Sequence, residues 1–199
     1  MNGSIWIRDQ AQFVIAANDI YASNPEKYRG HKWKSGEVLT SLLSIMSTPA
    51  QLERFDEIIR HAGDENYIKD PSHWPHIFLK MNNLDGNQVE GWGHKQDAWQ
   101  MLVWATFDGL EKGTIAMEDL SASHRQFLSK IVPFLEAVDF TNRENCGSWE
   151  EIEAVRSSTL AWEVSILEKI GEYSAKPGFE FLSEGFVGRS ESDSFSTHV

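Results

Sequence analysis

Residues 95–110, KQDAWQMLVWATFDGL, decide the fold class of this chain. Apolar side chains recur in this stretch at the spacing of one helix face, at Ala98, Met101, Leu102, Ala105 and Phe107. Gly113 supplies the stop signal. The same period returns in residues 5–21, 35–46, 51–61 and 120–138, and in a helix that follows Trp149-Glu150-Glu151 and runs through Ser157 to Tyr173. The sequence therefore predicts an all-α protein.

Residues 64–93 break this pattern, because they contain several proline and glycine residues and no sustained 3.6-residue period. We expect one long loop here with short extended segments, a strand over residues 76–80 and a hairpin turn at Asp85-Gly86. Pro133 should kink or divide the helix that contains it. Residues 1–182 are expected to form one domain, and residues 183–199, rich in serine, glycine and charge, a mobile tail.

The charge of the chain restricts its partners. The 199 residues carry a formal net charge of −12, which disfavours nucleic acid and anionic membrane surfaces. Neutral ligands such as sugars are not penalised. Cys146 is the only cysteine, so an internal disulfide or a cysteine metal cluster cannot form. The N-terminal residues do not resemble a signal peptide and no stretch is apolar enough to span a bilayer, so we expect a cytoplasmic location.

Three short motifs place polar groups beside aromatic residues at the start of a helix. They are SIWIRD at residues 4–9, GWGHKQDA at residues 91–98 and GSWEE at residues 147–151. Each motif alone is also explained by acidic residues in a first helical turn, where they favour the helix dipole.

Together and in this order, the motifs resemble the glucoamylase family of glycoside hydrolases and the related N-terminal domain of phosphorylase kinase regulatory subunits. That family has a Trp-x-Arg-Asp motif, a Trp-Gly-His-x-Gln-like motif followed by Asp, and a Trp-Glu-Glu motif. The resemblance covers residues 5–173. It implies an (α/α)6 barrel whose inner helices surround a sugar pocket, with this chain supplying about half of the helices, a partial barrel.

The resemblance also implies roles for individual residues, with an α-glucoside or glucan oligosaccharide as the ligand and with no metal or cofactor. Glu150 would be the general acid, and Glu151 would orient the substrate. The remaining pocket residues would be Arg8 and Asp9, which grip the hydroxyls of the terminal glucose, and Trp92, His94, Gln96, Asp97 and Trp149, which line the pocket.

The chemistry of inverting hydrolysis fits Glu150 as the acid. This reaction needs one protonated carboxyl group to donate to the leaving oxygen and one carboxylate to activate water on the opposite face. An indole and a second glutamate beside Glu150 raise its pKa through desolvation and like charge. The family's catalytic base lies well beyond the Trp-Glu-Glu motif. Nothing in the sequence chooses among four substitutes, Glu90, Glu144, Glu163 and Glu172.

Three functions therefore stay open at this point. The chain is a hydrolase of α-glucosidic bonds, complete or lacking its base, or it is a non-catalytic glycan-binding or regulatory module like the kinase-subunit domain. The third alternative is an unrelated helical interaction protein. Half of a barrel exposes a large apolar face, so a homo-oligomer or a partner chain that completes the barrel is also expected.

Overall fold

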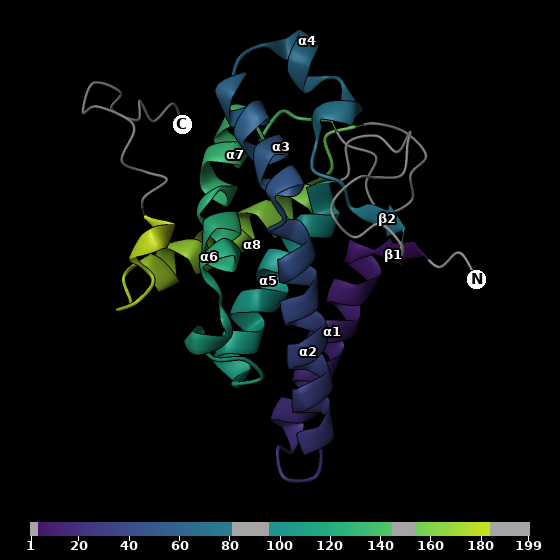
Figure 1. Ribbon diagram of the computed structural model, residues 1–199, viewed down its shortest axis with the longest axis vertical. Helices are drawn as coiled ribbons and strands as arrows, with labels where there is room; N and C mark the ends of the chain where they lie inside the picture. Colours follow the sequence, from purple (N-terminus) through teal and green to yellow (C-terminus); the bar gives the residue numbers. More distant parts are fainter. Residues whose placement is uncertain (1–3, 81–95, 145–153, 184–199) are drawn as a thin grey trace.

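The computed structural model describes residues 4–80, 96–144 and 154–183, and this part of the chain is mostly helical (Figure 1). The longer helices are α1 (Ile7–Ser23), α2 (Arg29–Met46), α3 (Pro49–Arg60), α5 (Gln96–Lys112) and α8 (Ser157–Ser174). Shorter helices are α4 (Glu65–Ile68), α6 (Ala122–Ser129) and α7 (Ile131–Ala137), with 3-10 turns η1 (Pro71–His73), η2 (Met117–Asp119) and η3 (Glu180–Leu182). The predicted all-α class is confirmed.

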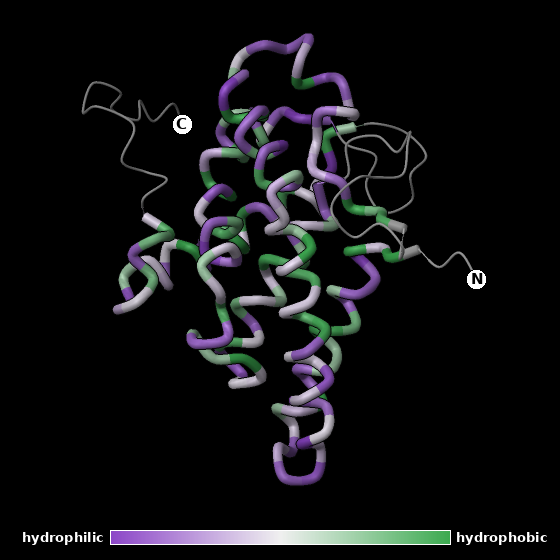
Figure 2. Tube along the Cα trace, in the orientation of Figure 1, coloured by the Kyte–Doolittle hydropathy of each residue, from purple (hydrophilic) through white to green (hydrophobic). Residues whose placement is uncertain are grey.

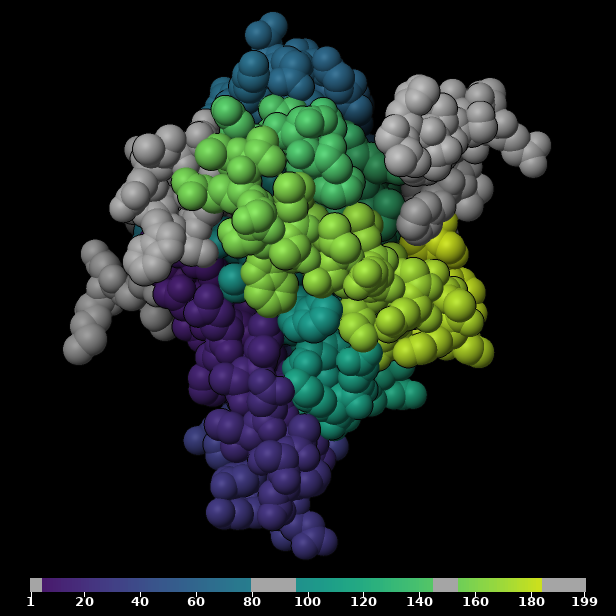
Figure 3. All heavy atoms as spheres, turned by 180° about the vertical axis from the view of Figure 1, so that it is seen from behind, coloured from purple at the N-terminus to yellow at the C-terminus, as the bar shows by residue number. Residues whose placement is uncertain are grey.

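Helix α5 lies at the centre of the molecule. It contacts α1 and α2 on one side and α8 on another. Thirteen of its 17 residues are buried, so its apolar surface is covered on nearly every side. In the hydropathy tube, α5 mixes hydrophobic and hydrophilic residues, whereas the tip of the α1–α2 hairpin is hydrophilic (Figure 2). Seen from behind, α8 lies across the middle of the molecule and the α1–α2 hairpin projects at one end (Figure 3).

An aromatic cluster joins α5 to the helices at its N-terminal end. Phe55 of α3 packs edge-on against Trp99 of α5, Phe127 of α6 and Phe134 of α7, with ring centroids 4.9–6.2 Å apart. Trp74 closes the cluster against Phe134 at 5.4 Å. Edge-to-face pairs of this kind add roughly 0.5–1.5 kcal/mol each beyond the burial of their area. The cluster therefore fixes α3 and α7 against the central helix.

The predicted loop contains more order than the sequence indicated. Helix α4 forms because the Asp64 side chain accepts hydrogen bonds from the Asn66 and Tyr67 N–H groups at its N-terminus. The predicted strand is confirmed over β2 (Phe78–Lys80), and it pairs antiparallel with β1 (Ser4–Trp6), the strand directly before α1. The predicted turn at Asp85-Gly86 lies outside the described residues.

Two helix boundaries also differ from the prediction. Helix α2 begins at Arg29, six residues before Ser35. Residues 29–34 lack the apolar stripe on which the prediction relied, so the sequence pattern did not show this first part of the helix. The helix predicted over residues 120–138 is divided at Lys130 into α6 and α7, and Pro133 lies in the first turn of α7, where a missing N–H costs nothing. The predicted tail lies outside the described residues, apart from Ser183.

Glycine at position 36 is required by a close approach between helix and loop. A Cβ added to Gly36 would lie 2.9 Å from the carbonyl oxygen of Thr114, whereas one added to Gly30, in the same helix, would meet nothing within 4 Å. We expect Gly36→Ala to destabilise the protein by about 1–2 kcal/mol through this clash. Gly30→Ala should stabilise it by up to about 1 kcal/mol through helix propensity. Urea unfolding measures both, and equal stabilisation by the two variants would contradict the close approach.

Candidate functional site

The first two sequence motifs meet at one buried ion pair. Arg8 lies in the first turn of α1 and Asp97 in the first turn of α5, and the Arg8 Nη1 donates to the Asp97 Oδ2 at 3.2 Å. The side chains are 12% and 4% exposed. Because the two residues are 89 positions apart, the contact depends on the packing of α1 against α5. It brings together residues that the resemblance assigns to one pocket.

Asp9 lies differently from its neighbour Arg8. Its side chain is 60% exposed, and its Oδ1 lies 3.8 Å from the Arg8 Nε. Arg8 therefore stands between one buried and one exposed carboxylate. A guanidinium group has five N–H donors in a fixed plane, so it can contact both carboxylates. Asp9 presents acceptor oxygens to solvent, as a residue that binds sugar hydroxyls would.

The short sheet β1–β2 positions the start of α1. Trp6 stacks on Phe78 across the two strands with ring centroids 4.2 Å apart, and the Ile7 N–H donates to the Ile77 carbonyl at 3.0 Å. The Arg8 guanidinium lies 5.9 Å from the centre of the Trp6 ring. An indole face attracts a cation at this range. The sheet therefore holds the arginine of the first motif in place.

A second group of buried polar side chains, Gln96, Gln100 and Glu163, lies on the side of α5 that faces α8. The Gln100 Nε2 donates to the Glu163 Oε1 at 2.7 Å. Gln96, one turn before Gln100, is fully buried, and its amide nitrogen and oxygen have no hydrogen-bond partner in the part of the chain that the structure describes. Buried polar groups are nearly always paired. An unpaired amide at this place fits a position where water or a hydroxylated ligand binds.

Burial raises the pKa of Glu163 to about 7, and the hydrogen bond from Gln100 opposes this rise. The cause is desolvation, since the side chain of Glu163 is 0% exposed and the charged form loses its hydration. At neutral pH the group is therefore close to half protonated. Carboxyl groups with such raised pKa values are the usual proton donors and acceptors of hydrolytic sites, although buried structural carboxyls share the shift.

The other predicted site residues are not brought into this group by the described structure. Trp92, His94, Trp149, Glu150 and Glu151 lie outside the described residues, as does Glu90 among the substitute bases. Glu144 is exposed on the surface beside Arg143, and Glu172 accepts from the Lys169 Nζ at 3.1 Å on the exposed face of α8. Of the three described candidates for a base, Glu163 is the one that lies beside α5.

Gln100 is the member of the group that sequence reasoning missed. The sequence does contain a signal for Gln100, because Gln96 and Gln100 are spaced by four residues and therefore share one face of the helix. Amide side chains that share a face inside a hydrophobic helix must find partners on a neighbouring helix. The sequence did not indicate which helix supplies that partner.

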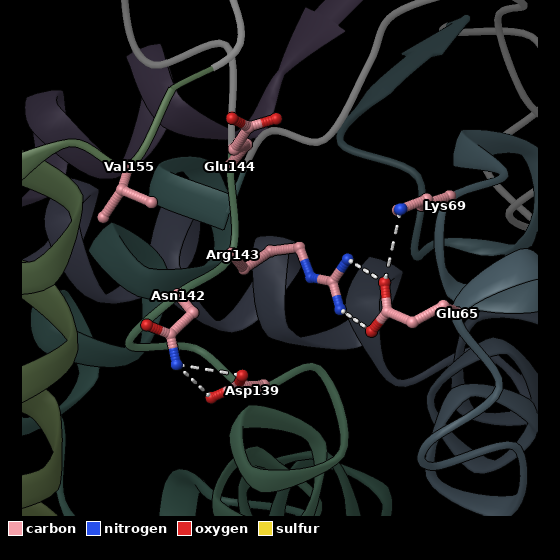
Figure 4. A pocket seen from close by; sticks show the side chains of 7 residues that line it. All are labelled: Glu65, Lys69, Asp139, Asn142, Arg143, Glu144 and Val155. Atoms are coloured by element: carbon pink, nitrogen blue, oxygen red, sulfur yellow. Dashed lines mark hydrogen bonds and ion pairs between the residues drawn. The ribbon is translucent and has the colours of Figure 1, made fainter.

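A separate pocket of about 490 Å3 lies near α4 (Figure 4). Its lining residues are Glu65, Lys69, Asp139, Asn142, Arg143, Glu144 and Val155. Their polar groups are mostly committed to one another. Arg143 donates two hydrogen bonds to the Glu65 carboxylate, at 2.9 and 3.3 Å, and holds the pKa of that carboxyl below its usual value. Asn142 donates to Asp139.

The pocket in Figure 4 therefore carries weaker evidence for a ligand than the buried group at α5. Among the residues that the structure describes, no group of three or more His, Cys, Asp or Glu could hold a metal ion, and no helix is both long and apolar enough to cross a bilayer.

Comparisons of the chain with protein-family models, with curated proteins and with solved structures give no match.

Removing the buried partner of Arg8 should cost more than removing the exposed one. Asp97→Ala leaves a buried guanidinium without this carboxylate, and we expect a loss of about 3 kcal/mol in the free energy of unfolding. Asp9→Ala removes an exposed partner of the same arginine and should cost about 0.5 kcal/mol or less. Urea unfolding at pH 7 measures both losses. Equal losses would show that burial of the pair has no energetic role.

The raised pKa of Glu163 makes stability depend on pH. Its pKa is 4.5 in the unfolded chain and about 7 in the folded one, so the folded state binds the extra proton between these values. The free energy of unfolding should therefore fall as pH rises from 4.5 to 7, by roughly 3 kcal/mol for this group. Glu163→Gln keeps a neutral hydrogen-bonding side chain and should remove this part of the slope. Identical slopes in wild type and variant, from urea unfolding at several pH values, would rule out the raised pKa.

Proposed function

We propose that this chain is a carbohydrate-active protein of the glucoamylase type, which hydrolyses α-glucosidic bonds with inversion. The observation that carries the proposal is the Arg8–Asp97 ion pair, because it joins the first and second motifs of the resemblance across 89 residues of sequence. The substrate is an α-glucoside or a glucan oligosaccharide.

The arrangement of helices supports the proposed partial (α/α)6 barrel. In such a barrel, helices pair as antiparallel hairpins and their ends surround the pocket. Helices α1 and α2 form one hairpin, and α5 packs between this hairpin and α8. Arg8, Asp97 and Gln96 belong to the first turns of α1 and α5, and Gln100 follows in the second turn of α5. We propose that a second copy or another chain supplies the remaining helices.

In the proposed reaction, the sugar hydroxyls bind to Asp9 and Arg8. Gln96 is fully buried, so it acts through a water that hydrogen-bonds to its amide, which has no partner in the described residues. Glu150 protonates the leaving oxygen as general acid. A carboxylate on the opposite face of the sugar ring takes a proton from water, and this water then attacks the anomeric carbon.

Glu163 is the candidate that we favour for this base. A general base works best when its pKa is close to the working pH, and burial brings the pKa of Glu163 to about 7. Glu172 lies in an exposed ion pair with Lys169, and Glu144 is exposed, so neither lies in the buried group beside α5. Because Glu163 is buried between α5 and α8, it can act only on a water bound within the group of Gln96 and Gln100.

The test is the hydrolysis of maltose by wild type and by Glu150→Gln, followed by proton NMR of the anomers. We expect β-glucose as the first product, and a fall in kcat of about 10²–10⁴-fold in the variant, with binding of acarbose retained. Glu172→Gln is the matched control, since it removes a carboxyl group from an exposed surface. Unchanged hydrolysis by Glu150→Gln would refute the assignment of the acid.

If wild type binds acarbose but does not hydrolyse maltose, the hydrolase hypothesis is wrong and the non-catalytic glycan-binding module is favoured. In that case Asp9→Ala should abolish the binding, because Asp9 presents its carboxylate to solvent beside Arg8. A well-folded wild type that neither binds acarbose nor hydrolyses maltose would refute the sugar site. The remaining alternative would then be an unrelated helical interaction protein.

A further inference from the structure

We propose that a surface pocket centred on Trp33 is a second sugar-binding site, which holds a long glucan while its end occupies the site near Arg8. We call it the Trp33 pocket. Its lining residues are Arg29, Lys32, Trp33, Gly36, Glu37, Thr40, Thr114, Ile115 and Asp119, and its volume is about 450 Å3. The choice of a glucan as the ligand rests on the proposed function, whereas the pocket itself does not.

Trp33 is the most exposed tryptophan of the described residues. It is 67% exposed, whereas Trp74 and Trp99 are buried and Trp6, Trp104 and Trp162 are partly covered. An exposed indole leaves a large apolar face in water, on which a ligand ring can stack. The apolar face of a pyranose ring matches it in shape and size. Its hydroxyl groups remain at the edge of the ring, where they can reach polar neighbours.

The rim of the pocket suits a neutral, hydroxylated ligand. Arg29 and Lys32 contribute two positive charges, and Glu37 and Asp119 contribute two negative ones, so the lining has no net charge. Thr40 adds a hydroxyl group. Charged donors and acceptors around an aromatic face can bond sugar hydroxyls from several directions. In a chain with a net charge of −12, a balanced lining offers no particular attraction to a cation or an anion.

The floor of the pocket is held rigidly. Gly36 packs against the Thr114 carbonyl, and the Thr114 hydroxyl donates to the Asn18 Oδ1 at 2.7 Å. Asn18 in turn donates to Asp108 at 2.8 Å, so α1, α2 and α5 are tied together directly beneath the pocket. A preformed floor loses little conformational entropy when a ligand binds. The pocket is therefore suited to binding in its present shape.

The two sites lie at opposite ends of α5. Asp97 and Gln96 are in its first turn, whereas Thr114 and Ile115 follow its last residue, Lys112. Seventeen residues of helix span about 25 Å. A disaccharide cannot reach both sites, but a polysaccharide can. Binding at the Trp33 pocket would raise the effective concentration of chain ends at the other site without changing its chemistry.

The experiment measures retention of the protein by amylopectin in affinity gel electrophoresis, with the rate of maltose hydrolysis as the second readout. We expect Trp33→Ala to weaken amylopectin binding about 5- to 10-fold, and Trp33→Phe to keep most of the binding because a ring remains. Maltose hydrolysis should be unchanged in both variants. Val164→Ala, which removes an exposed apolar side chain on α8, is the matched control and should bind as wild type does.

Equal retention of wild type and Trp33→Ala would overturn the Trp33 pocket and leave the proposed function intact. Loss of maltose hydrolysis together with amylopectin binding would also overturn it, because Trp33 would then act on the whole fold or on the first site. A dimer in sedimentation velocity that Trp33→Ala converts to a monomer would show that the pocket joins two copies of the chain. Amylopectin binding that depends on Trp33, in a protein that hydrolyses no maltose, would support the pocket while refuting the hydrolase.

Discussion

The burial of α5 on nearly all sides is the constraint on which the rest of the structure depends. A helix with 13 of 17 residues buried needs neighbours around its whole circumference, and α1, α2 and α8 supply them. Three of its buried polar residues are hydrogen-bonded to those neighbours. Asp97 contacts Arg8 of α1, Gln100 contacts Glu163 of α8, and Asp108 contacts Asn18 of α1. These contacts fix the register of the helices in a way that apolar packing alone does not.

The candidate site follows from the same constraint. The first five residues of α5 include three polar ones, Gln96, Asp97 and Gln100, at the point where α1 also begins. Two of them have protein partners, and Gln96 has none among the described residues. A protein that only needed a stable core would place apolar residues here. The retention of a polar group at this end of the helix is what gives the proposed sugar site its physical basis.

The sequence predicted the parts of the fold that local patterns control. The apolar period gave α1, α3, α5 and α8 to within a few residues, and Pro133 marked the division between α6 and α7. It could not predict that β2 pairs with β1, because the partner strand is more than 70 residues away. For the same reason the sequence pointed to Glu163 and Gln96 as separate candidates, but it could not predict the hydrogen bond between Glu163 and Gln100. Glu150, the central residue of the functional hypothesis, lies outside the described residues and stays a prediction.

The long-range pairs between α1 and α5 also bear on how the chain folds. Arg8 and Asp97 are separated by 89 residues, Asn18 and Asp108 by 90, and Asn18 and Thr114 by 96. Helical proteins usually fold fast because their contacts are local, and contacts across half of a chain slow the search. During synthesis the α1–α2 hairpin must wait, with its apolar face uncovered, until α5 has left the ribosome. Over that interval the unfinished chain exposes apolar surface to which chaperones can bind.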